Sequence, residues 1–186
     1  MFKYITENKI LFFLLKAFGL YLFWYMLYDL WLHPKSSLDN LVSTNLAYWS
    51  SLIIKSFGFI AIDSAAVSSD NITVIGIDGT HGLWVGDPCN GITLFALFVG
   101  FVIAYPGKIK NKLWFIPLGM LAIHIINIIR IVSLCLIVYY SPESLAFNHT
   151  YTFTILVYSF VFWLWLIWSN KYSNSSDIAS TQVEIK

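Results

Sequence analysis

Three side chains in this sequence, a thiol, a guanidinium and an imidazole, could together perform acyl transfer. Arg130 is the only arginine of the chain and lies inside a long apolar run, while Cys89 and His149 lie at the ends of two other apolar runs. A guanidinium at the centre of a membrane helix costs about 2.5–3.5 kcal/mol on insertion scales. It is therefore expected to be paired, placed near an interface or turned into a cavity, and we expect Cys89 and His149 as its partners.

The composition indicates an integral membrane protein that forms one unit. Of 186 residues, 58% are hydrophobic and only 11% are charged, whereas soluble domains usually carry about 25% charged residues. We expect one membrane-embedded domain over residues 1–170 and a polar, disordered cytoplasmic tail over 171–186. The net charge of +1 gives no indication of nucleic-acid binding. No zinc-ligand spacing, nucleotide-binding loop or redox motif is present, so we expect neither a metal nor a cofactor.

Four segments are long and apolar enough to predict transmembrane helices. A helix needs about 20 mostly apolar residues to cross the bilayer, and the candidates are residues 10–32, 90–106, 112–140 and 150–168. The sequence therefore predicts an all-α polytopic membrane protein with about four transmembrane helices.

Two further segments are predicted to lie outside the membrane core. Residues 46–62 are only moderately apolar and are interrupted by serines and a lysine. We interpret them as an amphipathic helix at the membrane surface, and a fifth crossing is the alternative. Residues 71–86 alternate apolar and polar side chains around Asp78-Gly79, which predicts a short β-hairpin.

The lysines predict the orientation in the cell membrane. Lys108, Lys110 and Lys112 crowd the loop between the second and third spans, and Lys171 follows the fourth. Positive charge marks the cytoplasmic side, so both termini are expected inside, with residues 33–89 and 141–149 outside. A crossing by residues 46–62 would put Cys89 inside and break this pattern.

The same topology predicts that the three reactive side chains lie at one depth. Cys89 and His149 begin the second and fourth spans at their outer ends. Arg130 follows Lys112 by 18 residues, roughly 27 Å of helix, close to the outer edge of a hydrocarbon core about 30 Å thick. Asn127 lies one turn from Arg130, and His124 one turn further, which makes a polar stripe on the third span.

The residues around Cys89 are those of a helix start. Asp87 is a suitable N-cap and Pro88 a suitable first helical residue. This would put the thiol in the first turn, where the helix dipole favours thiolate. Gly91 would let another backbone or a substrate approach. The alternatives are a packed cysteine, a disulfide from Cys89 to Cys135, an Arg130 that snorkels to headgroups and a His149 that is a solvated cap.

Taken in order, these residues resemble a known family. CNGI at the outer start of a span, NIIRI in the next span and an outer histidine before the last span resemble the exosortase/archaeosortase family, over roughly residues 85–168. The resemblance implies a membrane cysteine peptidase or transpeptidase with Cys89 as nucleophile and Arg130 and His149 as partners. Next to these three, we expect Asn127, Asp87, Asn90 and Gly91 as supporting residues. The resemblance also implies protein substrates that end in a short motif, a transmembrane helix and a basic tail. Either water or an amine of unknown identity would then accept the acyl group, and the sequence does not choose between them.

Two other classes of function also fit the sequence. A non-catalytic membrane subunit or polysaccharide-export accessory protein would use Arg130 to pair with Asp87 or Glu143. A transporter would use Arg130 as an anion site, but it would also need polar residues through several spans. The first, second and fourth spans have little polar lining, which weakens that interpretation.

Overall fold

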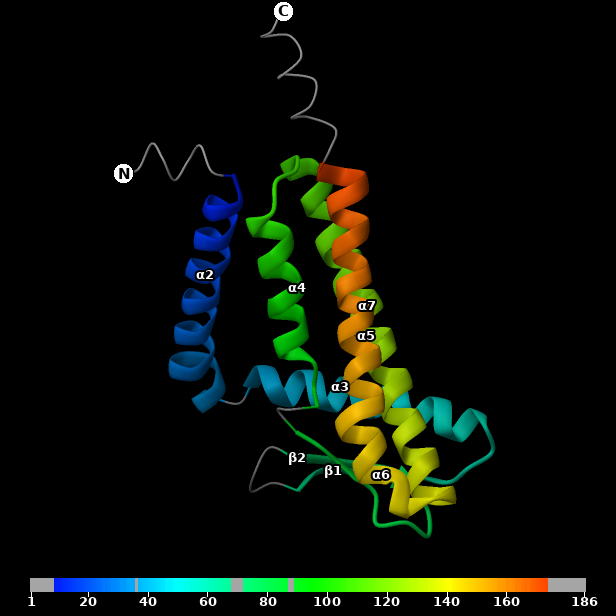
Figure 1. Cartoon of the computed structure of the whole chain (residues 1–186). Helices are drawn as coiled ribbons and strands as arrows, with labels where there is room; N and C mark the ends of the chain where they lie inside the picture. Colours follow the sequence, from blue (N-terminus) through cyan, green and yellow to red (C-terminus); the bar gives the residue numbers. More distant parts are fainter. Residues whose placement is uncertain (1–8, 36, 68–71, 87–88, 174–186) are drawn as a thin grey trace, which may run out of the picture.

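The computed structural model describes residues 9–35, 37–67, 72–86 and 89–173. Upright helical segments stand side by side, and a layer of other elements lies across one end of them (Figure 1). The upright segments are α2 (Lys9–Leu27), α4 (Ile92–Ala104), α5 (Ile109–Tyr140) and α7 (Phe153–Ile167). The layer across their end contains α3 (Ser37–Ser56) and a small sheet.

The helices confirm a polytopic helical membrane protein. By length and composition, three described helices can cross a membrane, namely Leu11–Lys35, Ile109–Tyr140 and Pro142–Tyr172. Two of these continue past the α-helices given above: α2 passes into η1 (Tyr28–Leu32) and η2 (His33–Lys35), and α7 is preceded by η3 (Pro142–Ser144), α6 (Leu145–Phe147) and η4 (Asn148–Thr152) and followed by η5 (Trp168–Ser173).

The second predicted span forms a helix, but α4 has only 13 residues. At about 1.5 Å per residue it is roughly 20 Å long, less than a hydrocarbon core of about 30 Å. Lys112 caps its end, since its Nζ donates to the carbonyl oxygens of Ile103 (2.9 Å) and Tyr105 (2.8 Å). Its middle packs tightly on α5, because Gly119 leaves room for the Phe98 ring, which a Cβ would strike.

The predicted amphipathic helix over residues 46–62 is shifted in the structure. α3 begins earlier, at Ser37, and ends at Ser56, because Gly58 takes a left-handed φ of 86° that turns the chain into a strand. α3 lies across the upright helices (Figure 1) and is not among the candidate spans within the described residues. Its outer face exposes large apolar side chains, which suits a helix at a membrane surface; they are Leu41, Tyr48, Trp49 and Leu52.

The predicted hairpin is part of a larger sheet. β2 (Ile72–Ile77) and β3 (Leu83–Val85) pair antiparallel around the Asp78-Gly79 turn, as the sequence predicts. A third strand, β1 (Ala61–Val67), pairs antiparallel with β2, which gives the order β1-β2-β3. The sequence of β1, AIDSAAV, is rich in alanine and serine and carries a weak strand signal, so this strand was not predicted.

Two apolar clusters meet along α5. One lies at the end of the bundle that carries α3 and the sheet, and is called the outer cluster here. It joins these elements to the C-terminal half of α5, and its members include Leu46, Ile54, Ile75, Val85, Ile131 and Cys135. The inner one joins α4, α5 and α7, with Phe98, Phe115, Ile123, Val157 and Trp168. Asn127 is buried on α5 where the stretch that serves the inner cluster ends and the stretch that serves the outer one begins, and Arg130 is buried one turn further, within the outer stretch. A polar site therefore lies where the upright helices meet the layer formed by α3 and the sheet.

Candidate active site

Cys89 lies in a turn between β3 and α4. Its backbone N–H donates to the carbonyl oxygen of Gly86 (2.8 Å), and so does that of Asn90 (3.0 Å). The helix begins only at Ile92, after Gly91 as the N-cap with a φ of 86°. The prediction that the thiol lies in the first helical turn was therefore wrong: Cys89 precedes the helix.

The predicted cap of that helix lies outside the described residues, because these do not include Asp87 and Pro88. Among the described residues, the side chain of Asn90 binds a free backbone N–H group at the start of α4. Its Oδ1 accepts a hydrogen bond from the Ile92 N–H at 3.0 Å. An Asx-type contact thus binds one of the N–H groups that every helix leaves free at its start.

The structure brings the thiol, the guanidinium and the imidazole together. Cys89 Sγ lies 3.1 Å from His149 Nε2. Arg130 Nη2 lies 3.9 Å from the same sulfur and 3.5 Å from the same ring nitrogen. Cys89 and Arg130 are only 8% and 7% exposed. One guanidinium nitrogen therefore faces both the sulfur and the imidazole in a largely dry site.

His149 reaches the site from a wide helical turn. It lies in η4, a stretch of π-helix within the long helical segment that leads into α7. Single π-turns are rare and occur often at functional sites. Thr154 Oγ1 donates to the His149 carbonyl oxygen at 3.2 Å, which binds a carbonyl of this irregular turn.

Arg130 has no carboxylate partner among the described residues. Its contacts are to Cys89 and His149, and its Nε has no hydrogen-bond partner there. Glu143 is exposed to solvent in η3, and Asp87 lies outside the described residues. The observed partners of the guanidinium are therefore the two groups with which it could do chemistry.

Two supporting residues hold the backbone of the nucleophile against α5. Asn127 Nδ2 donates to the Cys89 carbonyl oxygen at 3.1 Å, and Asn127 is fully buried. Gly91 makes this approach feasible, because a Cβ on it would lie 2.8 Å from Asn127 Nδ2. The close contact expected of Gly91 is therefore made by a side chain of α5.

The rest of the predicted polar stripe does not join the site. His124 Nε2 lies 2.9 Å from Asn45 Oδ1 on α3, so this histidine ties α5 to the outer layer. Cys135 is fully buried in the outer cluster, and both cysteines are free thiols. No disulfide joins Cys89 to Cys135.

Sequence reasoning missed Asp39 as part of the site. This aspartate lies in the first turn of α3 and is 1% exposed. Its Oδ1 accepts hydrogen bonds from Tyr28 Oη at 2.7 Å and from Asn90 Nδ2 at 2.9 Å. An isolated acid in a predicted outer segment carries no signal of such a contact, because it depends on where Asn90 lies in space.

The electrostatics of Cys89 differ from the expected activated thiolate. Burial raises the pKa of the Cys89 thiol above its ordinary value, and the Arg130 guanidinium beside it opposes this rise in part. The resting group is therefore a thiol near neutral pH, and it needs a base to become a nucleophile. His149 Nε2 lies at hydrogen-bond distance from that sulfur.

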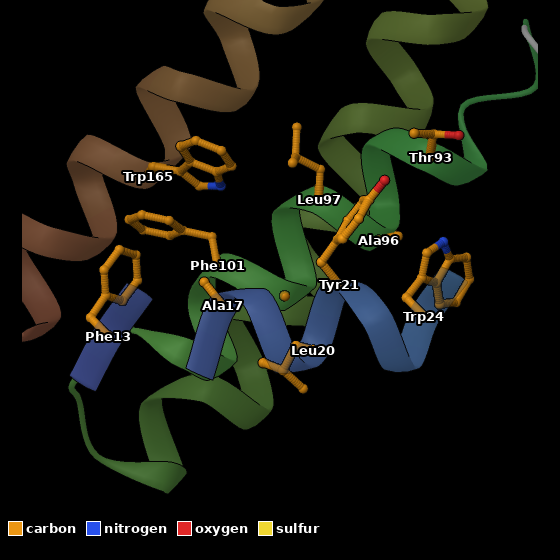
Figure 2. Close-up of a pocket in the computed structure, with 11 residues that line it drawn as sticks. Phe13, Ala17, Leu20, Tyr21, Trp24, Thr93, Ala96, Leu97, Phe101 and Trp165 are labelled. Carbon is orange, nitrogen blue, oxygen red and sulfur yellow. The ribbon is translucent and has the colours of Figure 1, made fainter. Parts of the chain in front are cut away.

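An apolar pocket lies next to α4, on the side of α2. Its volume is about 380 Å³, and it runs between the two helices with Trp165 of α7 at one end and Thr93 toward the other (Figure 2). Ala17, Ala96 and Gly100 line it among larger apolar side chains. Thr93 follows the Cys89 turn by four residues, so the pocket leads along α4 toward the site.

The described residues contain no group of three His, Cys, Asp or Glu side chains placed to hold a metal ion. Comparison with known families matches residues 4–169 to the family model described as transmembrane exosortase. No curated protein and no solved structure matches the chain. The match spans nearly all described helices as well as Cys89, Arg130 and His149.

Proposed function

This chain belongs to the transmembrane exosortase family, and from that premise we propose that it is a membrane-embedded cysteine peptidase or transpeptidase. Its substrates are exported proteins tethered to the membrane by a C-terminal sorting signal. The observation that carries the proposal is the buried contact of the Cys89 sulfur with His149 Nε2 and Arg130 Nη2. The three residue types are those needed for acyl transfer through a thioester.

The first half of the reaction forms the thioester. The Cys89 thiol proton passes to His149 Nε2 as the sulfur attacks the peptide carbonyl carbon. Arg130 stabilises the oxyanion that develops, and one well-placed donor of this kind is worth roughly 2.7–4 kcal/mol. The carbon–nitrogen bond then breaks, and protonated His149 gives its proton to the leaving amine. General acid–base catalysis of this kind typically contributes about 10²–10⁴-fold.

The second half releases the product. Water or an amine attacks the thioester carbon while His149 takes a proton from it. The carbon–sulfur bond breaks, and the proton returns to the Cys89 sulfur. Attack by water makes the enzyme a protease, and attack by an amine makes it a transpeptidase.

The shape of the molecule supports a tethered substrate. Cys89 lies in the turn that joins the sheet to α4, where the upright helices meet the layer of α3 and the sheet (Figure 1). The pocket between α2 and α4 reaches Thr93, four residues after Cys89 (Figure 2). A substrate helix beside α4 would bring its outer juxtamembrane peptide to the depth of Cys89. A basic tail that stays in the cytoplasm would hold the substrate helix at that depth. β3, an edge strand of the sheet, would extend the bound peptide by pairing with it.

Comparative proteomics of membrane and secreted fractions tests this proposal. Cells with the wild-type chain are compared with cells carrying Cys89→Ala, and we expect intact precursors to accumulate only in the mutant. Cleavage sites should lie just outside a C-terminal transmembrane helix, and deleting that helix from a substrate should prevent cleavage although the short motif is kept. Unchanged proteomes would favour a non-catalytic membrane subunit, and efficient cleavage of a soluble motif peptide would contradict delivery by the helix.

A further inference from the structure

We propose that Asp39 is a positioning residue that holds the Cys89 nucleophile in place through Asn90. The kinetic part of this inference rests on the proposed function, whereas the effect on thiol reactivity does not. Asp39 is 1% exposed, and its Oδ1 accepts one hydrogen bond from Asn90 Nδ2 (2.9 Å) and one from Tyr28 Oη (2.7 Å). The residue next to the nucleophile is thereby joined to α3 and to η1.

The side chain of Asn90 is held at both ends. Its Nδ2 donates to Asp39, and its Oδ1 accepts from the Ile92 N–H at 3.0 Å. An amide has one donor end and one acceptor end, so these two contacts together allow one orientation only. Asn90 is fully buried, and a reversed amide would leave both ends without a match.

The turn that carries Cys89 is thus held from two directions. From α5, Asn127 Nδ2 donates to the Cys89 carbonyl oxygen at 3.1 Å. From α3, Asp39 binds the neighbouring side chain. Cys89 precedes the helix, and its turn is closed by the two backbone hydrogen bonds to the Gly86 carbonyl oxygen. The two side-chain contacts then hold this turn against α5 and α3, and so help to place the Cys89 sulfur relative to His149 and Arg130.

A buried carboxylate without a cation is costly, and the start of α3, where Asp39 lies, offsets part of that cost through the helix dipole. Within the described residues, the hydrogen-bond partners of Asp39 are Tyr28 and Asn90, neither of which is a cation, and Oδ2 has no partner. Burial of an acid without a cation is unfavourable. What the carboxylate supplies is an oxygen that only accepts, which forces Asn90 to present its Nδ2 to α3 and its Oδ1 to the start of α4. An amide at position 39 could flip and present either its oxygen or its nitrogen, so it would not restrict Asn90 to this orientation.

A donor–acceptor swap tests the inference in the full chain, reconstituted in nanodiscs and carrying Cys135→Ala so that Cys89 is the only thiol. Asn90→Asp alone brings two carboxylates face to face, and we expect kcat to fall about 10²-fold with KM unchanged, as misplacement by about 1 Å can cost. In the double variant with Asp39→Asn, the new amide nitrogen donates to the new carboxylate, and the Tyr28 hydroxyl turns to accept. We expect the double variant to recover at least about tenfold of the loss, a coupling typical of directly contacting residues.

Alkylation of Cys89 by iodoacetamide gives a readout that does not need a substrate. The rates are compared on the high-pH plateau, where the charge added at position 90 no longer changes the fraction of thiolate. There Asn90→Asp and Asp39→Ala should both raise the alkylation rate, because a loosened turn exposes the thiol, and the swap should return the rate toward that of the parent. Ser50→Ala is the matched control: Ser50 is fully buried on the same helix and its hydroxyl has no partner among the described residues. We expect this control to change neither kcat nor the alkylation rate.

The outcomes separate the two proposals. If the swap restores thiol reactivity but no form of the protein cleaves a tethered substrate, the positioning role stands and the proposed function fails. Parental kcat and parental alkylation in Asn90→Asp would overturn the positioning role, and so would a double variant no better than the worse single one. Should Asn90→Asp not accumulate in the membrane, Asp39→Ala decides alone, since parental values for it would equally overturn the inference.

Discussion

His149 Nε2 lies 3.1 Å from Cys89 Sγ, although 60 residues separate them in the sequence. The contact forms because the turn before α4 and the π-helical turn before α7 lie at the same end of two neighbouring helices. Helix α5, which lies between them in the sequence, places Arg130 Nη2 beside both the sulfur and the imidazole nitrogen. Any change that moves one of these three segments should therefore alter the reactivity of the thiol.

Cys89→Ala should abolish substrate processing while the protein still accumulates in the membrane. The matched variant Cys135→Ala should process normally, because Cys135 is fully buried in the outer cluster and faces no reactive group there. Immunoblots of a substrate and of the protein itself measure both effects. If the two variants lost activity alike, a structural disulfide in cells would be the better account, despite the two free thiols of the structure.

Arg130→Lys should also fail to process substrate. Nη2 of Arg130 faces the sulfur at 3.9 Å and the imidazole at 3.5 Å at once, whereas a lysine ammonium is a point charge without the planar fork of donors. We expect a loss of about 10²–10³-fold in kcat, as for the removal of one oxyanion donor. Single-turnover assays in nanodiscs measure it. Activity at the wild-type level would show that a positive charge alone is enough.

The ionisation of Cys89 should occur at high pH. Burial raises the pKa of its thiol and Arg130 lowers it only in part, so the midpoint of the alkylation rate against pH should lie above the ordinary value of about 8.5. Arg130→Met removes the group that lowers the pKa, so the midpoint should move further up and alkylation at a fixed neutral pH should slow. A midpoint below the ordinary value in the wild type would contradict this and would indicate a resting thiolate.

Gly91→Ala should destabilise the protein and impair the site. Gly91 has a φ of 86°, and a left-handed conformation costs a residue with a Cβ roughly 1–2 kcal/mol. The added Cβ would also lie 2.8 Å from Asn127 Nδ2, which holds the Cys89 carbonyl. Thermal unfolding in detergent and processing in cells measure the two effects.

Gly100→Ala is the control for the unfolding measurement alone, because Gly100 also lines the pocket between α2 and α4. Gly100 lies within α4, and a Cβ there would meet nothing within 4 Å. We expect this variant to be as stable as the wild type or more stable by about 0.5–1 kcal/mol, since alanine favours a helix over glycine. Equal destabilisation by both substitutions would mean that the strain at Gly91 is not the cause.

Both termini should lie in the cytoplasm, with residues 63–88 outside. The start of α2, the connection from α4 to α5 and the end of α7 lie at one end of the molecule, and α3 and the sheet lie at the other (Figure 1). That first end carries the lysine-rich loop, which marks the inner side of a membrane. Reporter fusions at residues 75, 109 and 175 measure the orientation. A periplasmic signal at residue 109, or a cytoplasmic one at residue 75, would refute it.

The long helices, and the three side chains that are candidates for chemistry, could be predicted from local sequence. Transfer of an apolar segment into lipid depends on that segment's own composition, so the first, third and fourth spans could be predicted without knowledge of their neighbours. The depth of Arg130 followed from counting residues along one helix. The order of Cys89, Arg130 and His149 along the chain was enough to expect them at one end of the bundle.

Tertiary structure decided what no local pattern encodes. Strand β1 forms because β2 provides the partner with which it pairs. Helix α3 begins at Ser37, earlier than its apolar pattern predicts. The helix after Cys89 begins only at Ile92, because Asn90 and Gly91 form its cap. The burial of Asp39 against Asn90 depends on two segments 51 residues apart. Burial also raises the pKa of the Cys89 thiol, whereas a helix start alone would lower it. Each of these outcomes depends on which groups are buried when the segments pack together, and burial is a property of the assembled fold.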